Sequence, residues 1–157
     1  MPHRLKHYLC NEILLIIMIQ RIQSIWLLLA ALLVWLTWKL PFYTGIQIND
    51  VQPGVFSTLN GGYDWLTNLL TIGSGVLAFA AIFLFKNRGL QTRFSAAALL
   101  LQITLVVRYL QLVQNNFQSG TYSLTAVLIA LSMVLLVQAI RNIRRDQRLL
   151  EESDRLR

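Results

Sequence analysis

The amino-acid sequence predicts an all-α integral membrane protein, a bundle of four transmembrane helices with both termini in the cytoplasm. The chain of 157 residues is 55% hydrophobic and only 13% charged, which is too little polar surface for a soluble domain of this size. It also contains several long apolar runs with few or no charges, each able to span roughly the 30 Å of a hydrocarbon core. The predicted spans are at about residues 22–40, 65–85, 94–113 and 121–140.

The short segment between the second and third spans fixes the predicted orientation. Its sequence is KNRGLQTR, and it carries Lys86, Arg88 and Arg93. Because short loops rich in Lys and Arg stay on the cytoplasmic side, this loop is predicted to be cytoplasmic. Both termini then lie on the same side. Further arginines stop the fourth span there, namely Arg141, Arg144 and Arg145.

The net charge of +7 could indicate a nucleic-acid-binding protein. We exclude nucleic acid as a partner because the basic residues lie beside the apolar runs, where membrane topology and anionic lipid head groups account for them. The single cysteine, Cys10, cannot form an intrachain disulfide, so no disulfide-bonded extracellular module is predicted.

Residues 1–17 look detached from the rest of the chain. Their apolar patch at residues 13–17 is too short to span a membrane, and no small-residue cleavage site follows it. We expect an upstream extension ahead of a natural start at Met18, with a membrane domain over residues 18–157. The alternative is a short amphipathic segment on the inner surface.

Two connecting segments are predicted to lie on the outer, extracytoplasmic side of the membrane. Residues 41–64 contain no Lys or Arg, alternate like a short strand in YTGIQI, and carry the turn signals QPG and NGG. They are expected to form a small extracytoplasmic cap with one hairpin. Residues 115–121, with the sequence NNFQSGT, are expected to form a short neutral turn.

Small and weakly polar residues recur on one side of the second span. Thr67, Thr71, Ser74 and Ala78 follow helical spacing, and Asn68 and Gly75 overlap that side. We interpret them as a packing face, because small residues let neighbouring helices approach closely. A substrate-lining face is the alternative.

Arg108 is the charged residue inside the third span, and such a residue is a functional candidate by default. It lies roughly 8 Å below the expected outer interface, a distance that an arginine can cover by snorkelling. In the folded hairpin of the second and third spans, Arg108 is level with about Thr71 and can reach outward. We therefore predict a structural intramembrane contact of Arg108 with Asp64 or Asn68. Ligand or ion binding and an oligomer contact stay open.

The tail at residues 141–157 has no Gly or Pro and should continue the fourth helix. Two interpretations are open for it. It is either a solvated extension whose arginines touch lipid phosphates, or a docking helix for a cytoplasmic partner or a second subunit. Its thin apolar stripe consists of Ile143, Leu149, Leu150 and Leu156.

The sequence offers no constellation for catalysis. Both histidines, His3 and His7, fall in the doubtful extension, and no Cys, His and carboxylate residues have the spacing of metal ligands. No acid–base pair or activated nucleophile is evident either. We expect no enzymatic activity and assign no catalytic, cofactor-binding or metal-binding residue.

Three segments resemble a known family. They are MIQRIQSIWLLLAA at residues 18–31, FLFKNRGLQTRF at residues 83–94 and IRRDQRLLEESDRLR at residues 143–157. They resemble the opening, the basic loop and the closing signature of the bacterial membrane-protein family labelled domain of unknown function 4293. Members of this family are small and are predicted to cross the inner membrane four times.

The resemblance implies a multi-pass protein of the bacterial inner membrane, and it implies no established activity, cofactor or catalytic residue. It also implies that several tail residues belong to one motif, namely Asp146, Leu149, Asp154, Arg155 and Leu156.

The sequence thus favours a structural or accessory membrane protein that binds a partner. Its expected partners are the lipid bilayer and either a second copy of the chain or an unknown membrane or cytoplasmic protein. The alternative function is a small transporter or channel subunit that acts as an oligomer through the polar helix faces around Arg108.

Overall fold

The computed structural model describes residues 24–47 and 56–155 of the chain. The predicted extension at residues 1–17, the QPG turn and Leu156 of the tail motif lie outside the described residues.

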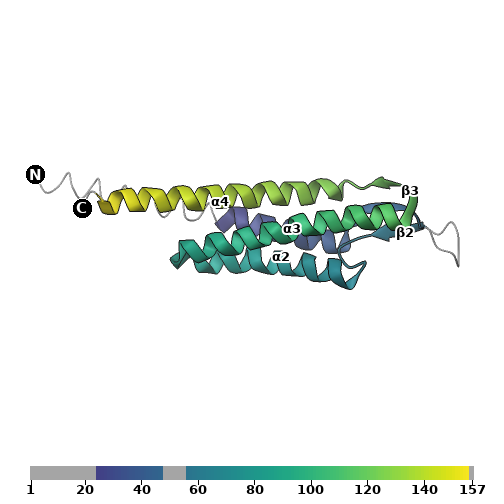
Figure 1. Ribbon diagram of the computed structural model, residues 1–157, viewed down its shortest axis with the longest axis horizontal. Helices are drawn as coiled ribbons and strands as arrows, with labels where there is room; N and C mark the ends of the chain where they lie inside the picture. The colour runs from purple at the N-terminus through teal and green to yellow at the C-terminus, as the bar shows by residue number, and fades with distance from the viewer. Residues whose placement is uncertain (1–23, 48–55, 156–157) are drawn as a thin grey trace, which may run out of the picture.

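Within the described residues, four helices run side by side along the long axis of the molecule (Figure 1). Three of them are long and apolar enough to cross a membrane, and the first is a shorter apolar helix. The predicted class of a helical membrane protein is therefore supported by length and composition. The helices are Ser24–Lys39, α2 at Trp65–Phe83, α3 at Arg88–Asn116 and α4 at Thr125–Arg155.

The segment between α2 and α3 is shorter than the predicted basic loop. A 3₁₀ turn, η1 at Leu84–Lys86, follows α2, and Asn87 then caps α3 by accepting a hydrogen bond from the Leu90 backbone at 3.3 Å. Because an Asn at this position satisfies a free backbone amide, α3 begins at Arg88, six residues before the predicted span. Arg88 and Arg93 thus lie on α3 and not in a loop.

A three-stranded antiparallel sheet at the other end of the bundle adds to the predicted all-α fold. Strand β1 (Tyr43–Gln47) lies in the centre, between β2 (Phe56–Leu59) and β3 (Phe117–Tyr122). The pairing of β1 with β2 is the predicted hairpin of the outer cap. The predicted turn at residues 115–121 is wrong, because α3 continues to Asn116 and β3 then pairs with β1.

Two glycines allow this pairing. Gly45 and Gly120 face each other across β1 and β3, and a Cβ on Gly45 would come within 3.0 Å of the Gly120 Cα. The ring of Tyr43 covers both glycines, since its Cε1 lies 3.0 Å and 2.8 Å from the positions that their Cβ atoms would occupy. The side chain of Tyr43 therefore fills space that the glycines leave free.

The sheet is fixed to the helices by an aromatic cluster. Phe42 stacks on Tyr109 of α3 with ring centroids 4.6 Å apart. Tyr43 packs edge-on against Phe117 at 5.2 Å and Tyr122 at 5.0 Å. Such pairs add to the burial of apolar area, so the sheet and the adjoining half of the bundle form one packed unit.

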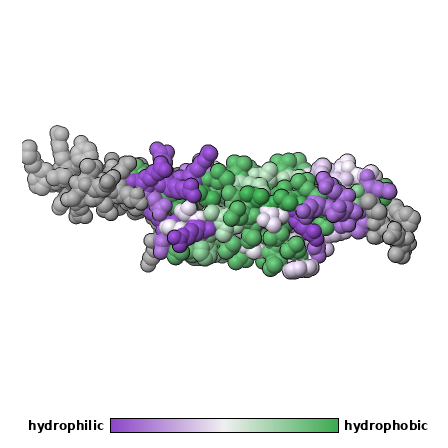
Figure 2. Space-filling model, viewed as in Figure 1, coloured by the Kyte–Doolittle hydropathy of each residue, from purple (hydrophilic) through white to green (hydrophobic). Residues whose placement is uncertain are grey.

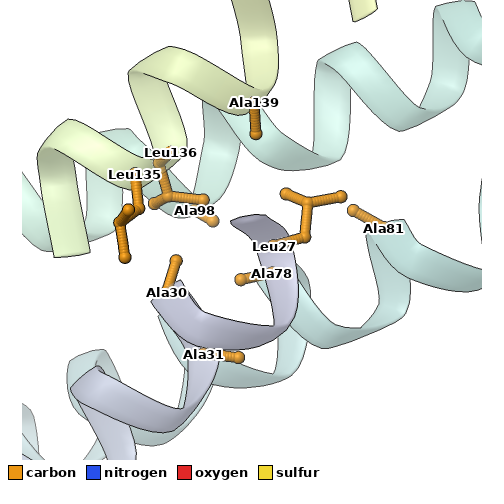
Figure 3. Packing of buried hydrophobic residues seen from close by; sticks show 9 residues of the cluster. All are labelled: Leu27, Ala30, Ala31, Ala78, Ala81, Ala98, Leu135, Leu136 and Ala139. Atoms are coloured by element: carbon orange, nitrogen blue, oxygen red, sulfur yellow. The ribbon is translucent and has the colours of Figure 1, made fainter. Parts of the chain in front are cut away.

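The other half of the bundle is packed with small residues. Side chains from all four helices converge there, and most of them are alanines (Figure 3). Alanines let helix backbones approach closely, as in membrane bundles generally. The buried cluster consists of Leu27, Ala30, Ala31, Ala78, Ala81, Ala98, Leu135, Leu136 and Ala139.

The surface divides into three zones along the long axis (Figure 2). Hydrophobic side chains form a band in the middle, and hydrophilic side chains gather towards both ends. The outward-facing residues of the band include Leu100 and Val107 on α3 and Val134 on α4. This is the surface expected for a protein that faces lipid around its middle.

Helix α4 is the longest element. Its 31 residues run without a break and extend about 46 Å. It projects beyond the ends of α2 and α3 (Figure 1). Ile143 and Asp146, which fall in the predicted tail, are still buried against the bundle, so the packed part of α4 continues beyond the predicted end of the fourth span at residue 140.

Candidate functional site: two ion pairs on α3

The first ion pair joins α3 to the start of α2. The Arg108 Nη2 donates to Asp64 Oδ2 at 3.2 Å, and the two side chains are 32% and 29% exposed. Asp64 is the residue immediately before α2, in an extended conformation, and Thr67 hydrogen-bonds to its backbone N–H and C=O. The structure thus brings together two of the three residues for which the sequence predicts an intramembrane contact.

The third of these residues, Asn68, is half-buried on α2 and is not the partner of the Arg108 Nη2. Its Oδ1 is buried and accepts no hydrogen bond in the described part of the chain. Asn68 therefore remains a polar group close in sequence to the ion pair without being a member of it.

Thr104, Gln111 and Asn115 recur with Arg108 at the spacing of one side of α3. Thr104, Gln111 and Asn115 are exposed, whereas the buried face of α3 carries Gln102, Leu105 and Tyr109. Arg108 lies on the flank between the two faces and is partly exposed.

The small and polar face of α2 is buried, as Thr67, Thr71 and Ser74 are fully inaccessible. The Thr71 hydroxyl donates to the Thr67 carbonyl at 2.7 Å, and the Ser74 hydroxyl donates to the Thr71 carbonyl at 3.1 Å. Because these protons are used within the helix, the face can pack against its neighbours without further donors or acceptors. This favours the packing interpretation over a substrate-lining face.

Gly75 gives this face its closest contact. A Cβ on Gly75 would lie 2.9 Å from the Trp35 Cε2 and would overlap the indole Nε1. The indole of the first helix therefore occupies the space that the missing side chain leaves on α2. The sequence alone did not predict this contact, because it joins two helices that are far apart in the chain.

Towards the sheet end of α2 and α3, two polar atoms are buried without a hydrogen-bond partner among the described residues. They are Asn68 Oδ1 and Arg108 Nε. The Tyr109 hydroxyl is buried beside Thr71 of α2. Tyr109 was not predicted as a site residue, although it follows Gln102 and Leu105 at the spacing of one helix face. A buried polar atom without a hydrogen-bond partner costs free energy, so the side chains of Asn68 and Arg108 are not fully satisfied within the described residues.

A further polar contact joins α3 to α4 in the middle of the bundle. The Ser132 hydroxyl lies 3.1 Å from Gln102 Oε1 and 2.7 Å from the Ile129 carbonyl. A hydroxyl has one proton, so Ser132 can donate to one of these oxygens at a time. Ser132 and Gln102 are both fully buried, so the contact links α3 and α4 inside the bundle.

The second ion pair lies at the opposite end of α3. Arg88 Nη1 is 3.7 Å from Asp146 Oδ2 of α4, and the two side chains are 19% and 10% exposed. The sequence placed Arg88 in the cytoplasmic loop and Asp146 in the tail motif, without pairing them. The sequence alone did not predict this contact, because the two residues are far apart in the chain and meet only through the packing of α3 against α4.

The two ion pairs are separated by most of the length of α3. Arg88 and Arg108 are 20 residues apart on one continuous helix (108 minus 88), which corresponds to about 30 Å. This matches the thickness of a hydrocarbon core of roughly 30 Å. The Arg108–Asp64 pair lies towards the sheet end of α3, and the Arg88–Asp146 pair lies towards its opposite end.

The remaining predicted residues are spread over the basic end. Arg93, Arg141, Arg144, Arg145 and Leu149 are exposed. Lys86 ends η1, and Asp154 and Arg155 lie at the end of α4. Among the described residues, no group of three or more His, Cys, Asp or Glu side chains is arranged to hold a metal ion.

These features define a class of protein: a small helical protein with three helices long and apolar enough to cross a membrane and a sheet at one end of its bundle. The chain belongs to the family described as a domain of unknown function, DUF4293, whose family model matches residues 19–156. The family predicted from the three sequence segments is thus confirmed. No curated protein matches the chain.

Proposed function

We propose that this protein is an accessory protein of the bacterial inner membrane, in which the helical bundle anchors α4 and presents its C-terminal part to a partner protein. The observation that carries the proposal is the length of α4. Its 31 residues extend about 46 Å, which exceeds the hydrocarbon thickness of roughly 30 Å by several helical turns.

The base of the projecting part is held firmly. Ile143 is fully buried, and Asp146 pairs with Arg88 of α3. Beyond this pair, Leu149 is 52% exposed. Because the helix is continuous through these positions, residues after Asp146 are displayed at a fixed angle to the bundle.

The distribution of charge supports a cytoplasmic location for this end. It carries Arg88, Arg93 and the arginines that follow residue 140 of α4, whereas the sheet end has Lys39 and the Arg108–Asp64 pair. An excess of Lys and Arg next to membrane spans indicates the cytoplasmic side. The sheet would then lie outside, and the C-terminal part of α4 would face cytoplasmic proteins.

The proposal is tested by photo-crosslinking in native membranes. A photo-reactive residue replaces Leu149, and the matched control carries it at Val134, which is exposed on the apolar band of α4. We expect a discrete protein adduct from position 149 and only lipid adducts from position 134. Lipid adducts alone at both positions would contradict the proposed role of α4.

A small transporter or channel subunit is the second candidate function. It is favoured by the buried polar atoms of Asn68 and Arg108 that have no hydrogen-bond partner among the described residues. Four helices are few for a solitary transporter, so this function requires an oligomer. A crosslink from position 149 to a second copy of the chain would support it in place of a partner-binding role.

A further inference from the structure

The outward face of α4 changes abruptly from apolar to basic. Val127, Val134 and Val137 are exposed on the apolar band, and Arg141 and Arg144 continue the same side of the helix. The spacing shows this, because residues seven apart, such as Val134 and Arg141, lie on nearly the same line along a helix.

Four arginines form one stripe at this point. Arg141, Arg144, Arg145 and Arg148 follow the spacing i, i+3, i+4 and i+7, which places them within an arc of about 100°. All four are exposed.

The stripe points away from the protein. Ala139, Ile143 and Asp146 are buried against the bundle, and they lie on the opposite side of α4 from the arginines. The arginines therefore do not line the helix bundle. They continue the surface that faces lipid.

Helix α3 repeats this arrangement at the same depth. Arg93 is exposed and lies on the line of Leu100 and Val107, the outward face of α3. The Arg88–Asp146 pair sets the two helices level. Arg93 and Arg141 are each five residues, about 8 Å, from this pair towards the centre of the band, so they lie at the same depth.

We infer that this arginine belt, defined as Arg93, Arg141, Arg144, Arg145 and Arg148, binds the phosphates of anionic phospholipid head groups in the adjacent monolayer. The molecules that cover the valines of the apolar band are lipids, and the arginines begin one turn further along the same face. Guanidinium groups bind phosphate oxygens through two parallel hydrogen bonds, which suits a phosphodiester head group.

The net charge at this end favours an anionic lipid over a zwitterionic one. Its described side chains include the five belt arginines and Arg88, against one carboxylate, Asp146, so the sum is six minus one, or +5. Basic clusters directly beside a membrane span attract anionic lipids for this reason. The inference concerns the packed part of α4 and does not depend on a protein partner for its tail.

The test is lipid competition on the purified full-length protein, read by native mass spectrometry. The probes are phosphatidylglycerol and phosphatidylcholine with identical acyl chains, offered together in equal amounts. We expect the protein to retain phosphatidylglycerol over phosphatidylcholine by a factor on the order of ten or more. The variant with Arg141→Gln, Arg144→Gln, Arg145→Gln and Arg148→Gln should bind the two lipids nearly equally.

Two matched variants locate the effect. Lysine at the same four positions keeps the charge and should retain most of the preference, whereas Lys39→Gln at the sheet end should leave it unchanged. Circular dichroism checks that each variant is folded. If the fourfold glutamine variant does not fold, the single variant Arg144→Gln replaces it, and this variant is expected to lose part of the preference for phosphatidylglycerol. Equal retention of both lipids by the unaltered protein, or an undiminished preference in the glutamine variants, would overturn the inference.

Discussion

At the scale of single residues, the Arg108–Asp64 pair is the contact that ties α3 to the entrance of α2. Both side chains are about one-third exposed, so the pair is only partly desolvated. The substitution Arg108→Leu should lower the free energy of unfolding in detergent by about 1 kcal/mol. Asp64→Asn keeps a residue that favours the start of a helix and should reproduce part of this loss.

A double-mutant cycle of Arg108→Leu and Asp64→Asn measures the interaction itself. We expect a coupling free energy of about 1 kcal/mol, obtained from denaturant or thermal unfolding of the two single variants and the double variant. Arg93→Leu is the matched control, since Arg93 is an exposed arginine on the same helix outside both ion pairs. Additive losses from the two single variants would show that the pair contributes nothing to stability.

The contact of Gly75 with Trp35 gives a second prediction at this scale. Gly75→Ala forces the indole to move and should cost about 1–3 kcal/mol of stability, together with a change in tryptophan fluorescence. Gly73→Ala is the control, because its Cβ would meet only Leu101 at an ordinary distance of 3.6 Å. That variant should be as stable as the parent or slightly more stable, since alanine favours a helix over glycine. Equal losses from both substitutions would contradict the packing described for Gly75.

At the scale of elements, the apolar runs predicted the helices well and their ends less well. A continuous run of apolar residues is a strong signal for a membrane helix, and α2 begins at Trp65 as predicted. The arginines before residue 94 were interpreted as a loop. Charged residues also occur in the first turns of a helix that extends beyond the membrane, and the Asn87 cap sets the start of α3.

Strand β3 could not be predicted from its own residues. Its sequence, FQSGTY, contains glycine and serine, has no charged residue and alternates weakly. It becomes a strand because β1, from a loop more than 60 residues earlier, offers a free edge beside it. The Arg88–Asp146 pair was missed for the same reason, as both contacts depend on how distant segments are placed.

The pairing of β1 with β3 can be tested by a designed disulfide. Thr44 and Thr121 are directly opposite each other, so the double variant Thr44→Cys and Thr121→Cys, made with Cys10→Ser, should crosslink on mild oxidation. The disulfide is detected as a change in mobility on a non-reducing gel. Thr44→Cys with Ser119→Cys is the control, because Ser119 is opposite Ile46 and should crosslink much less. Equal yields from the two variants would contradict the register.

At the scale of the whole molecule, three features distinguish the two ends of the bundle. A hydrophobic band lies between two hydrophilic ends, the two ion pairs of α3 lie towards these ends, and the exposed residues of α4 change from valine to arginine on approaching the end opposite the sheet. The aromatic cluster holds the sheet at one end of the helix bundle, and α4 projects from the other end. A bundle built in this way holds one long helix at a fixed position, which is the basis of the proposed accessory role.

The central claim is that the sheet lies outside and the projecting end of α4 lies in the cytoplasm. Ser119 and Leu149 are both exposed, so a single cysteine at either position can test this claim. Each is introduced together with Cys10→Ser, and spheroplasts are treated with a membrane-impermeant maleimide. We expect Ser119→Cys to be labelled in intact spheroplasts and Leu149→Cys to be labelled only after lysis. Labelling of both variants in intact spheroplasts, or the reverse pattern, would contradict the claim.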